Sequence, residues 1–186
     1  PGLSQSPAAI KLLEHWIVHN VPLLLDADAL NLLSTHSHLK AAMQSRKAAS
    51  IITPHPGEAA RLLGCSAARI QQDRSKCALK LAEELNAICV LKGAGSICAH
   101  PDGEWFINTS GNPGLASAGM GDVLSGIISS FIAQGLSAFD AAKLSVYLHG
   151  AAADKLVEQG IGPVGLTASE ISLEVRNLIN QYNKQK

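Results

Sequence analysis

Apolar residues along this chain occur in two patterns, short unbroken runs and longer segments in which they recur every three or four positions. Runs at 21–25 and 88–91, together with the isoleucine pair within 50–53, are typical of strands buried in a parallel sheet. The recurring pattern predicts amphipathic helices. These are expected over 7–19, 58–63, 67–86, from Val123 to a stop at Gly135, over 137–158, and after a capping box at Thr167–Glu170.

A β-hairpin is predicted after the third apolar run. Its strands are Ile97–Ala99 and Trp105–Ile107, which flank the turn sequence Pro101-Asp102-Gly103. Strands that alternate with helices predict an α/β fold with a largely parallel sheet. No repeat or linker interrupts the 186 residues, so residues 1–186 are expected to form a single domain.

The formal net charge of zero restricts the range of partners. A neutral chain lacks the basic field that would draw it to nucleic acid or to an acidic membrane surface, so neither partner is expected. The four cysteines include no Cys-x-x-Cys pair, which argues against a zinc site and a disulfide framework. With no long apolar run and no basic leader, the chain is predicted to be a soluble, cytoplasmic protein.

The candidate chemistry centres on the glycine-rich stretch 111–122, which leads directly into a predicted helix. Glycines let the backbone N–H groups approach a ligand, and the helix N-terminus favours an anion. Asp122 ends this stretch, where a carboxylate could accept a proton while a phosphoryl group moves. The alternative is that Asp122 is only the N-cap of the helix that begins at Val123.

Polar residues also follow the predicted strands. Asp26, Asp28 and Asn31 come directly after the first strand, at the carboxyl end where open α/β sheets bind ligands. The alternative is that one of the two aspartates caps the next helix. After the second strand, His55 stands between Pro54 and Pro56, which confine its backbone and place its ring for ligand contact. A purely structural histidine is the alternative there.

A short glycine loop follows the third strand. Lys92-Gly93-Ala94-Gly95-Ser96 combines a cation with two glycines that permit close backbone approach, which suits a phosphate or nucleotide. A solvated lysine in a surface turn is the alternative.

Five segments carry a family resemblance: Leu25-Asp-Ala-Asp-Ala-Leu-Asn31, Thr53-Pro-His-Pro-Gly-Glu58, Leu91-Lys-Gly-Ala-Gly-Ser96, Gly111-Asn-Pro-Gly114 and Gly119-Met-Gly-Asp-Val-Leu-Ser-Gly126. In this order they resemble the ADP-dependent NAD(P)H-hydrate dehydratases, nicotinamide-nucleotide repair enzymes with a ribokinase-like fold. The resemblance covers essentially the whole chain. It implies a three-layer sandwich with a mostly parallel sheet.

The resemblance also implies a reaction and a set of site residues. ADP phosphorylates the hydroxyl group of NADH hydrate or NADPH hydrate, phosphate is eliminated, and AMP is left. Magnesium would accompany the diphosphate, and no residue of this chain is predicted as a metal ligand. By the motif match, Asp122 is the base, and Asp122, His55 and Gly2 bind the hydrate. Lys92, Gly93, Ala94, Gly95, Ser96 and Gly121 bind ADP or AMP, with Asp26, Asn31 and Asn112 in support.

The chain departs from the family at its start. Pro1-Gly2-Leu3-Ser4 resembles the family's Gly-Pro-Gly-Leu-Gly turn without its first glycine, and Ser4 stands where the family has glycine. The N-terminal part of the domain is therefore expected to be missing. The sheet edge left without those strands predicts association, such as a homo-oligomer. The family often carries an epimerase domain, on the same or a separate chain.

Two other functions remain open from the sequence. One is an ATP-dependent ribokinase-like kinase of a small vitamin-precursor alcohol, which would share Gly-x-Gly-Asp but is not expected to carry Thr-Pro-His-Pro-Gly-Glu. The other is a catalytically silent fragment that binds a nucleotide without turnover.

Overall fold

The computed structural model describes residues 2–183, so Pro1 of the predicted N-terminal turn lies outside the described residues. The chain forms two compact units, one of Pro1–Ile107 with Ser137–Phe139, the other of Asn108–Leu136 with Asp140–Lys186. The single domain expected from the sequence stays a prediction.

The first unit contains a five-stranded sheet in the order β1-β2-β3-β4-β5. β1 (Leu23–Leu25), β2 (Ser50–Ile52) and β3 (Ile88–Leu91) are parallel, with Leu24 beside Ile51 and Ile52 beside Cys89. β4 (Ile97–Ala99) and β5 (Trp105–Ile107) form the predicted hairpin and continue the sheet in antiparallel pairing. All five predicted strands are thus confirmed, and the parallel part of the sheet is its first three strands.

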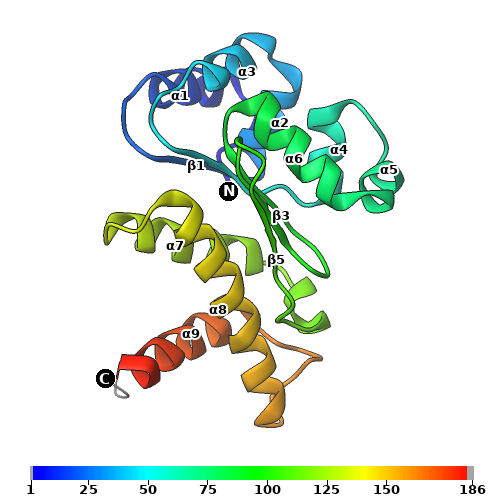
Figure 1. Cartoon of the computed structure of the whole chain (residues 1–186), viewed down its shortest axis with the longest axis vertical. Helices are drawn as coiled ribbons and strands as arrows, with labels where there is room; N and C mark the ends of the chain where they lie inside the picture. Colours follow the sequence, from blue (N-terminus) through cyan, green and yellow to red (C-terminus); the bar gives the residue numbers. More distant parts are fainter. Residues whose placement is uncertain (1, 184–186) are drawn as a thin grey trace. The chain divides into compact units, whose positions relative to one another are not determined.

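Six helices are described in this unit, and Figure 1 draws them in its upper part, in blue to green. They are α1 (Pro7–Ile17), α2 (Asp28–Thr35), α3 (Ser37–Gln44), α4 (Pro56–Leu63), α5 (Ala67–Gln72) and α6 (Arg74–Leu85). Their apolar faces share one buried core with β1 to β4. Among its most deeply buried members are Ile17, Leu32, Leu39, Ile52, Leu85 and Leu91.

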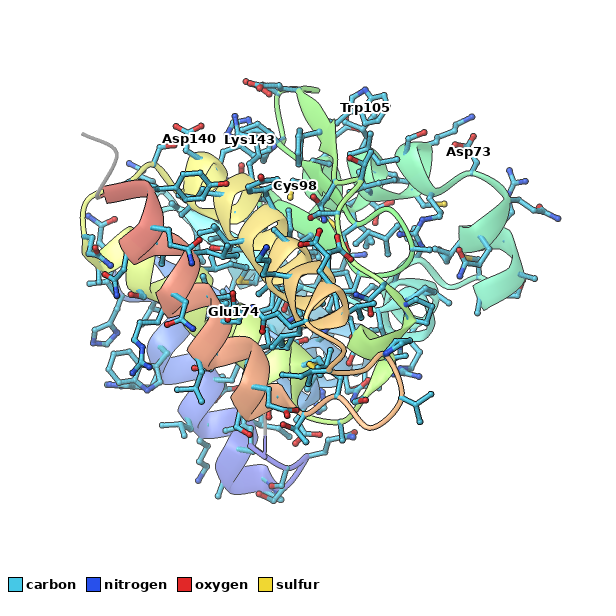
Figure 2. All side chains as sticks on the ribbon, turned by 90° about the horizontal axis from the view of Figure 1, so that it is seen from below. Asp73, Cys98, Trp105, Asp140, Lys143 and Glu174 are labelled. Carbon is cyan, nitrogen blue, oxygen red and sulfur yellow. The ribbon has the colours of Figure 1, made fainter. Side chains whose placement is uncertain are left out.

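The single helix predicted over 67–86 is wrong, because the helical pattern is broken at Asp73. This residue, labelled in Figure 2, has φ −150° and ψ 75°, which is not helical. Its carboxylate accepts a hydrogen bond from the Lys76 amide at 3.2 Å and so caps α6. An aspartate that bonds the backbone in this way competes with continuation of the helix. The end predicted near Asn86 is confirmed, since Asn86 is the left-handed C-cap of α6.

The second unit is helical. It contains a 3₁₀ turn (Pro113–Ala116), α7 (Met120–Ala133), most of α8 (Ala138–Glu158), and α9 (Ala168–Asn183). The predicted capping box is present, because the Thr167 amide donates to Glu170 Oε2 at 2.8 Å. The core of this unit is formed by Met120, Leu148, Ala152, Ala153, Leu156, Leu166, Ile171 and Val175.

Between residues 2 and 183, no helix combines the length and the apolar character needed to cross a membrane.

Candidate functional site

The loop after β3 presents unbonded backbone donors. The Lys92 amide donates to the Pro54 carbonyl at 2.8 Å, which anchors the start of this loop beside the end of β2. Within residues 2–183, the amides of Gly93 to Ser96 donate no hydrogen bond, whereas the Gly93 carbonyl accepts one from the Ser96 hydroxyl at 3.2 Å. Successive free N–H groups in a glycine turn form a concave site for an anion.

Lys92 is joined to Asp26 by an ion pair. Its Nζ lies 2.9 Å from Asp26 Oδ1, and the Asp26 side chain is 3% exposed. The alternative of a solvated turn lysine is therefore wrong. Capping by an aspartate is wrong as well, because the N-cap of α2 is Ala27, with no side-chain cap bond. Asp28 Oδ2 instead accepts from the Ser4 amide at 2.9 Å.

His55 is the N-cap of α4, which confirms its structural role. Its Nδ1 accepts hydrogen bonds from the Gly57 amide at 3.0 Å and the Glu58 amide at 3.4 Å. The Glu58 carboxylate accepts in return from the His55 amide at 2.8 Å. Because Nδ1 is an acceptor, the ring proton is on Nε2, which lies 3.4 Å from Glu58 Oε1 on a half-exposed ring. Hydrate binding by His55 stays a prediction.

The remaining predicted residues of the first unit lie at its surface or contact other groups. Gly2 is exposed with φ +68°. Ser4 has φ +67°, a left-handed conformation that glycine adopts more readily, which accounts for the glycine of the resembling family turn. Asn31 Oδ1 accepts from Arg61 Nε at 2.9 Å. Substrate binding by Gly2 and support by Asn31 therefore stay predictions.

In the second unit, α8 holds the glycine-rich loop at several points. Asp154 accepts from the Gly111 amide at 2.7 Å and from Asn112 Nδ2 at 3.0 Å. Asn112 Oδ1 accepts from the Gly114 amide at 3.0 Å and so caps the 3₁₀ turn. Gly150 permits contact with this loop, because a Cβ there would lie 2.2 Å from Ser110 Oγ. Asn112 thus anchors the glycine-rich loop, and its support of ligand binding stays a prediction.

The N-terminus of α7 has no side-chain cap. Its N-cap is Gly119, with φ +81°, so the helix begins at Met120 and not at Val123 as predicted. Asp122 is therefore the third helical residue, and the alternative that it is the N-cap is wrong. Its side chain is exposed and makes no hydrogen bond or ion pair within the part of the chain described. The amides of Met120, Gly121 and Asp122 are left for an anion.

His149 packs beneath this helix start. Burial lowers its pKa to about 4, against the opposing effect of a hydrogen bond with the Met120 backbone. The ring is therefore neutral at pH 7, and its buried Nε2 has no hydrogen-bond partner in the described structure. Neutral His149 therefore contacts the first residue of α7 without adding charge there.

Two residues that contact these loops were not predicted from the sequence. Asp154 follows three alanines in the helix predicted over 137–158, and this isolated acidic side chain was the available signal. Arg74 contacts the loop after β3, and its placement depends on the helix break at Asp73, for which the apolar pattern holds no signal. Residues 2–183 contain no group of three or more His, Cys, Asp or Glu side chains placed to hold a metal ion.

Comparison with known proteins gives these loops a family context. A family model described as NAD(P)H-hydrate dehydratase matches residues 1–176. The chain belongs to this family. Among relatives, an ADP-dependent (S)-NAD(P)H-hydrate dehydratase of Neisseria meningitidis is 45% identical over 185 residues, which are 98% of this chain and 62% of the relative. The bifunctional NAD(P)H-hydrate repair enzyme Nnr of Escherichia coli is 45% identical over 97% of this chain and 33% of its own.

Solved structures confirm the ribokinase-like fold of this dehydratase family member. An ADP/ATP-dependent NAD(P)H-hydrate dehydratase from Bacillus subtilis, co-crystallised with ATP and Mg²⁺, matches with a TM-score of 0.86 and 31% identity. The match covers 98% of this chain and 62% of that one. A ribokinase-like superfamily protein from Enterococcus faecalis matches with a TM-score of 0.81. The chain thus spans less than two thirds of the length of these relatives.

Proposed function

We propose that the chain carries out ADP-dependent dehydration of NADH hydrate and NADPH hydrate. The ring hydroxyl group of the hydrate takes the terminal phosphoryl group of ADP, as the P–O bond to AMP breaks. The ring C–O bond then breaks, phosphate leaves with that oxygen, and loss of a proton from the neighbouring ring carbon restores the double bond. The products are AMP, phosphate and NADH or NADPH. The observation that carries this proposal is the exposed Asp122 in the first turn of an uncapped helix whose amides are free for an anion.

The nucleotide would be bound by two sets of backbone donors. The amides of Gly93 to Ser96 and that of Gly121 have no partner within residues 2–183, so they can donate to phosphate oxygens. Lys92 would add a charged donor from the end of β3. Asp26 supports it through the ion pair that fixes the direction of its ammonium group.

Asp122 would accept the proton of the substrate hydroxyl group as the phosphoryl group arrives. An exposed carboxylate without a hydrogen bond is free to take that position, and a base of this kind is needed in phosphoryl transfer. His55 and Gly2 would contact the hydrate, with Asn31 in support. Asn112 would hold the glycine-rich loop through Asp154.

Magnesium would reach the site with the nucleotide. Mg²⁺ in nucleotide enzymes is held mainly by phosphate oxygens and waters with one or two carboxylates, so a site without a cluster of three protein ligands suits a nucleotide-borne ion. When bound, the ion would neutralise charge on the diphosphate oxygens.

A homo-oligomer, an epimerase partner and a cytoplasmic location are further predictions of this proposal. The epimerase partner is suggested by the name of the Escherichia coli relative, which is that of a bifunctional enzyme.

The kinase alternative has less support. A hydroxyethylthiazole kinase matches with a TM-score of 0.62 at 17% identity, which shows the fold alone.

The proposed dehydration is tested by mixing the chain with NADH hydrate, ADP and Mg²⁺ and following the absorbance of the reduced nicotinamide. Recovery of NADH with equal release of AMP is the expected result. ADP binding without turnover would instead favour the silent nucleotide-binding fragment.

A further inference from the structure

We propose that Arg74 is a positioning residue for the nucleotide. Its guanidinium group holds the carbonyl side of the loop after β3, and this turns the amides of Gly93 to Ser96 toward the ligand. The inference rests on the proposed function, because it gives a role to the loop assigned there to ADP.

The contacts of Arg74 are concentrated on one nitrogen. Nη2 donates to the Leu91 carbonyl at 3.2 Å, the Lys92 carbonyl at 3.4 Å and the Gly95 carbonyl at 3.2 Å. Nη1 donates to Gln71 Oε1 at 3.1 Å, which restrains the plane of the group from the side of α5. A planar guanidinium with donors in fixed directions can hold several carbonyls at once, whereas an ammonium group lacks that geometry.

The two sides of the loop backbone therefore differ. Its carbonyls at Leu91, Lys92 and Gly95 are bound to Arg74, and that of Gly93 is bound to the Ser96 hydroxyl. Its amides from Gly93 to Ser96 are free within residues 2–183. A loop fixed through its carbonyls loses less freedom when an anion binds its amides, so Arg74 preorganises the site.

Gly93 shows how closely the guanidinium approaches the loop. A Cβ at this position would lie 2.7 Å from Arg74 Nη1 and 3.0 Å from Nη2, and the backbone has φ +144°. Real Cβ atoms do not approach other atoms so closely. A side chain at 93 would therefore push the guanidinium away from the loop, and the positive φ itself favours glycine.

Charge gives Arg74 a second effect on an anion. Lys92 is neutralised in part by Asp26, whereas Arg74 forms no ion pair with a carboxylate among residues 2–183. Arg74 is placed at the first position of α6 by the break at Asp73, so its side chain reaches the loop from a fixed helix end. Its uncompensated charge attracts the phosphates that the neighbouring amides bind.

The test compares Arg74→Met and Arg74→Lys with Arg69→Met. Arg69 is a matched control, because it is exposed on α5 and its guanidinium has Gln72 Oε1, at 3.2 Å, as its one hydrogen-bond acceptor among residues 2–183. Calorimetry gives the Kd for ADP, NMR order parameters report the rigidity of Gly93 and Gly95, and the melting temperature checks the fold. Steady-state kinetics separate KM for ADP from kcat.

We expect Arg74→Met to raise the Kd and the KM for ADP by roughly 10- to 100-fold while kcat at saturating ADP changes little. Arg74→Lys keeps the charge without the planar guanidinium group, so it should show an intermediate loss of ADP affinity. It replaces the methionine variant as the test if that variant does not fold. Both Arg74 variants should also lower the order parameters at Gly93 and Gly95. Arg69→Met should change neither the ADP affinity nor these order parameters. Unchanged ADP affinity in a folded Arg74→Met protein would overturn this inference alone. Failure of the unaltered chain to bind ADP would overturn the proposed function and this inference together.

Discussion

Lys92 and Asp26, which are 66 positions apart in the chain, form an ion pair of 2.9 Å between the ends of β3 and β1. The carboxylate is almost fully buried, whereas the lysine side chain is 21% exposed. Asp26 Oδ1 also accepts from the Ala27 amide at 2.9 Å, so the carboxylate itself is fixed. A fixed, buried partner gives the ammonium group one direction, which suits a residue that must meet a phosphate.

The first prediction concerns this pair. Asp26→Asn should lower the free energy of unfolding by about 1–3 kcal/mol, less than for a fully buried pair, because the exposed part of Lys92 can reach water. For a chain of this size, that corresponds to a fall in melting temperature of about 2–12 °C. Thermal denaturation measures it. Asp28→Asn is the control, since Asp28 accepts from the Ser4 amide and forms no ion pair with a lysine in the described part of the chain. Equal losses in both variants would contradict a special role for the pair.

The second prediction concerns Gly93. Gly93→Val should abolish ADP binding while the fold is kept, because its side chain would block close approach of the backbone to the nucleotide and would also displace the Arg74 guanidinium from the loop. Gly103→Val separates this contact from backbone strain. Gly103 also has a positive φ, +99°, but a Cβ there would have no atom within 4 Å. Calorimetric titration with ADP and circular dichroism give the two readouts. If both valine variants bind ADP normally, the nucleotide binds elsewhere.

The strands and most helices could be predicted from the sequence because each depends on a local pattern. The run Ile88–Leu91 is apolar throughout and is buried throughout. The break at Asp73 could not be predicted in this way. The apolar pattern continues across it from Ile70 to Cys77, and the break depends on whether one carboxylate bonds the backbone or water.

The site residues that directly follow strands could be predicted from the sequence. The side-chain partners of these residues could not. Asp26 and Lys92 could each be named, because both follow strands of a parallel sheet. Their ion pair depends on strand order and side-chain direction, which a single sequence does not specify. Arg74 was missed because its three carbonyl partners are 17 to 21 positions away and because its place at the start of α6 depends on the break at Asp73.

The third prediction concerns pH. Burial lowers the pKa of His149 to about 4 from 6.5, so the unfolded chain binds more protons than the folded one between these two values. This group therefore makes stability fall as the pH drops from about 6.5 to about 4, by up to about 3 kcal/mol. Urea denaturation at several pH values measures the slope.

His149→Gln should flatten that slope because it removes the titrating ring. His38→Gln is the matched control, since His38 is 55% exposed and pairs with Glu14 at the surface. In the His38→Gln control, the free energy of unfolding should fall at acid pH as steeply as in the unaltered protein. A His149→Gln protein with the same pH dependence as the unaltered chain would show that another group causes the acid loss.

The last prediction concerns Asp122. Asp122→Asn should keep the fold and ADP binding, because the side chain is exposed and does not cap α7. Turnover should fall by about 10²- to 10⁴-fold if the carboxylate is the base. Stability should change by less than about 1 kcal/mol, the size of the interaction between a carboxylate and the helix dipole.

Asp122→Ala extends the test, because alanine removes the hydrogen-bonding capacity that asparagine keeps. A capping residue would lose stability in the alanine variant and keep it in the asparagine variant, whereas a base loses turnover in both. Gly119 already occupies the N-cap position, so we expect the two variants to have similar melting temperatures and similarly low turnover. Near-normal turnover of Asp122→Asn would show that Asp122 is not the proton acceptor. The proposed function would then lose its main support.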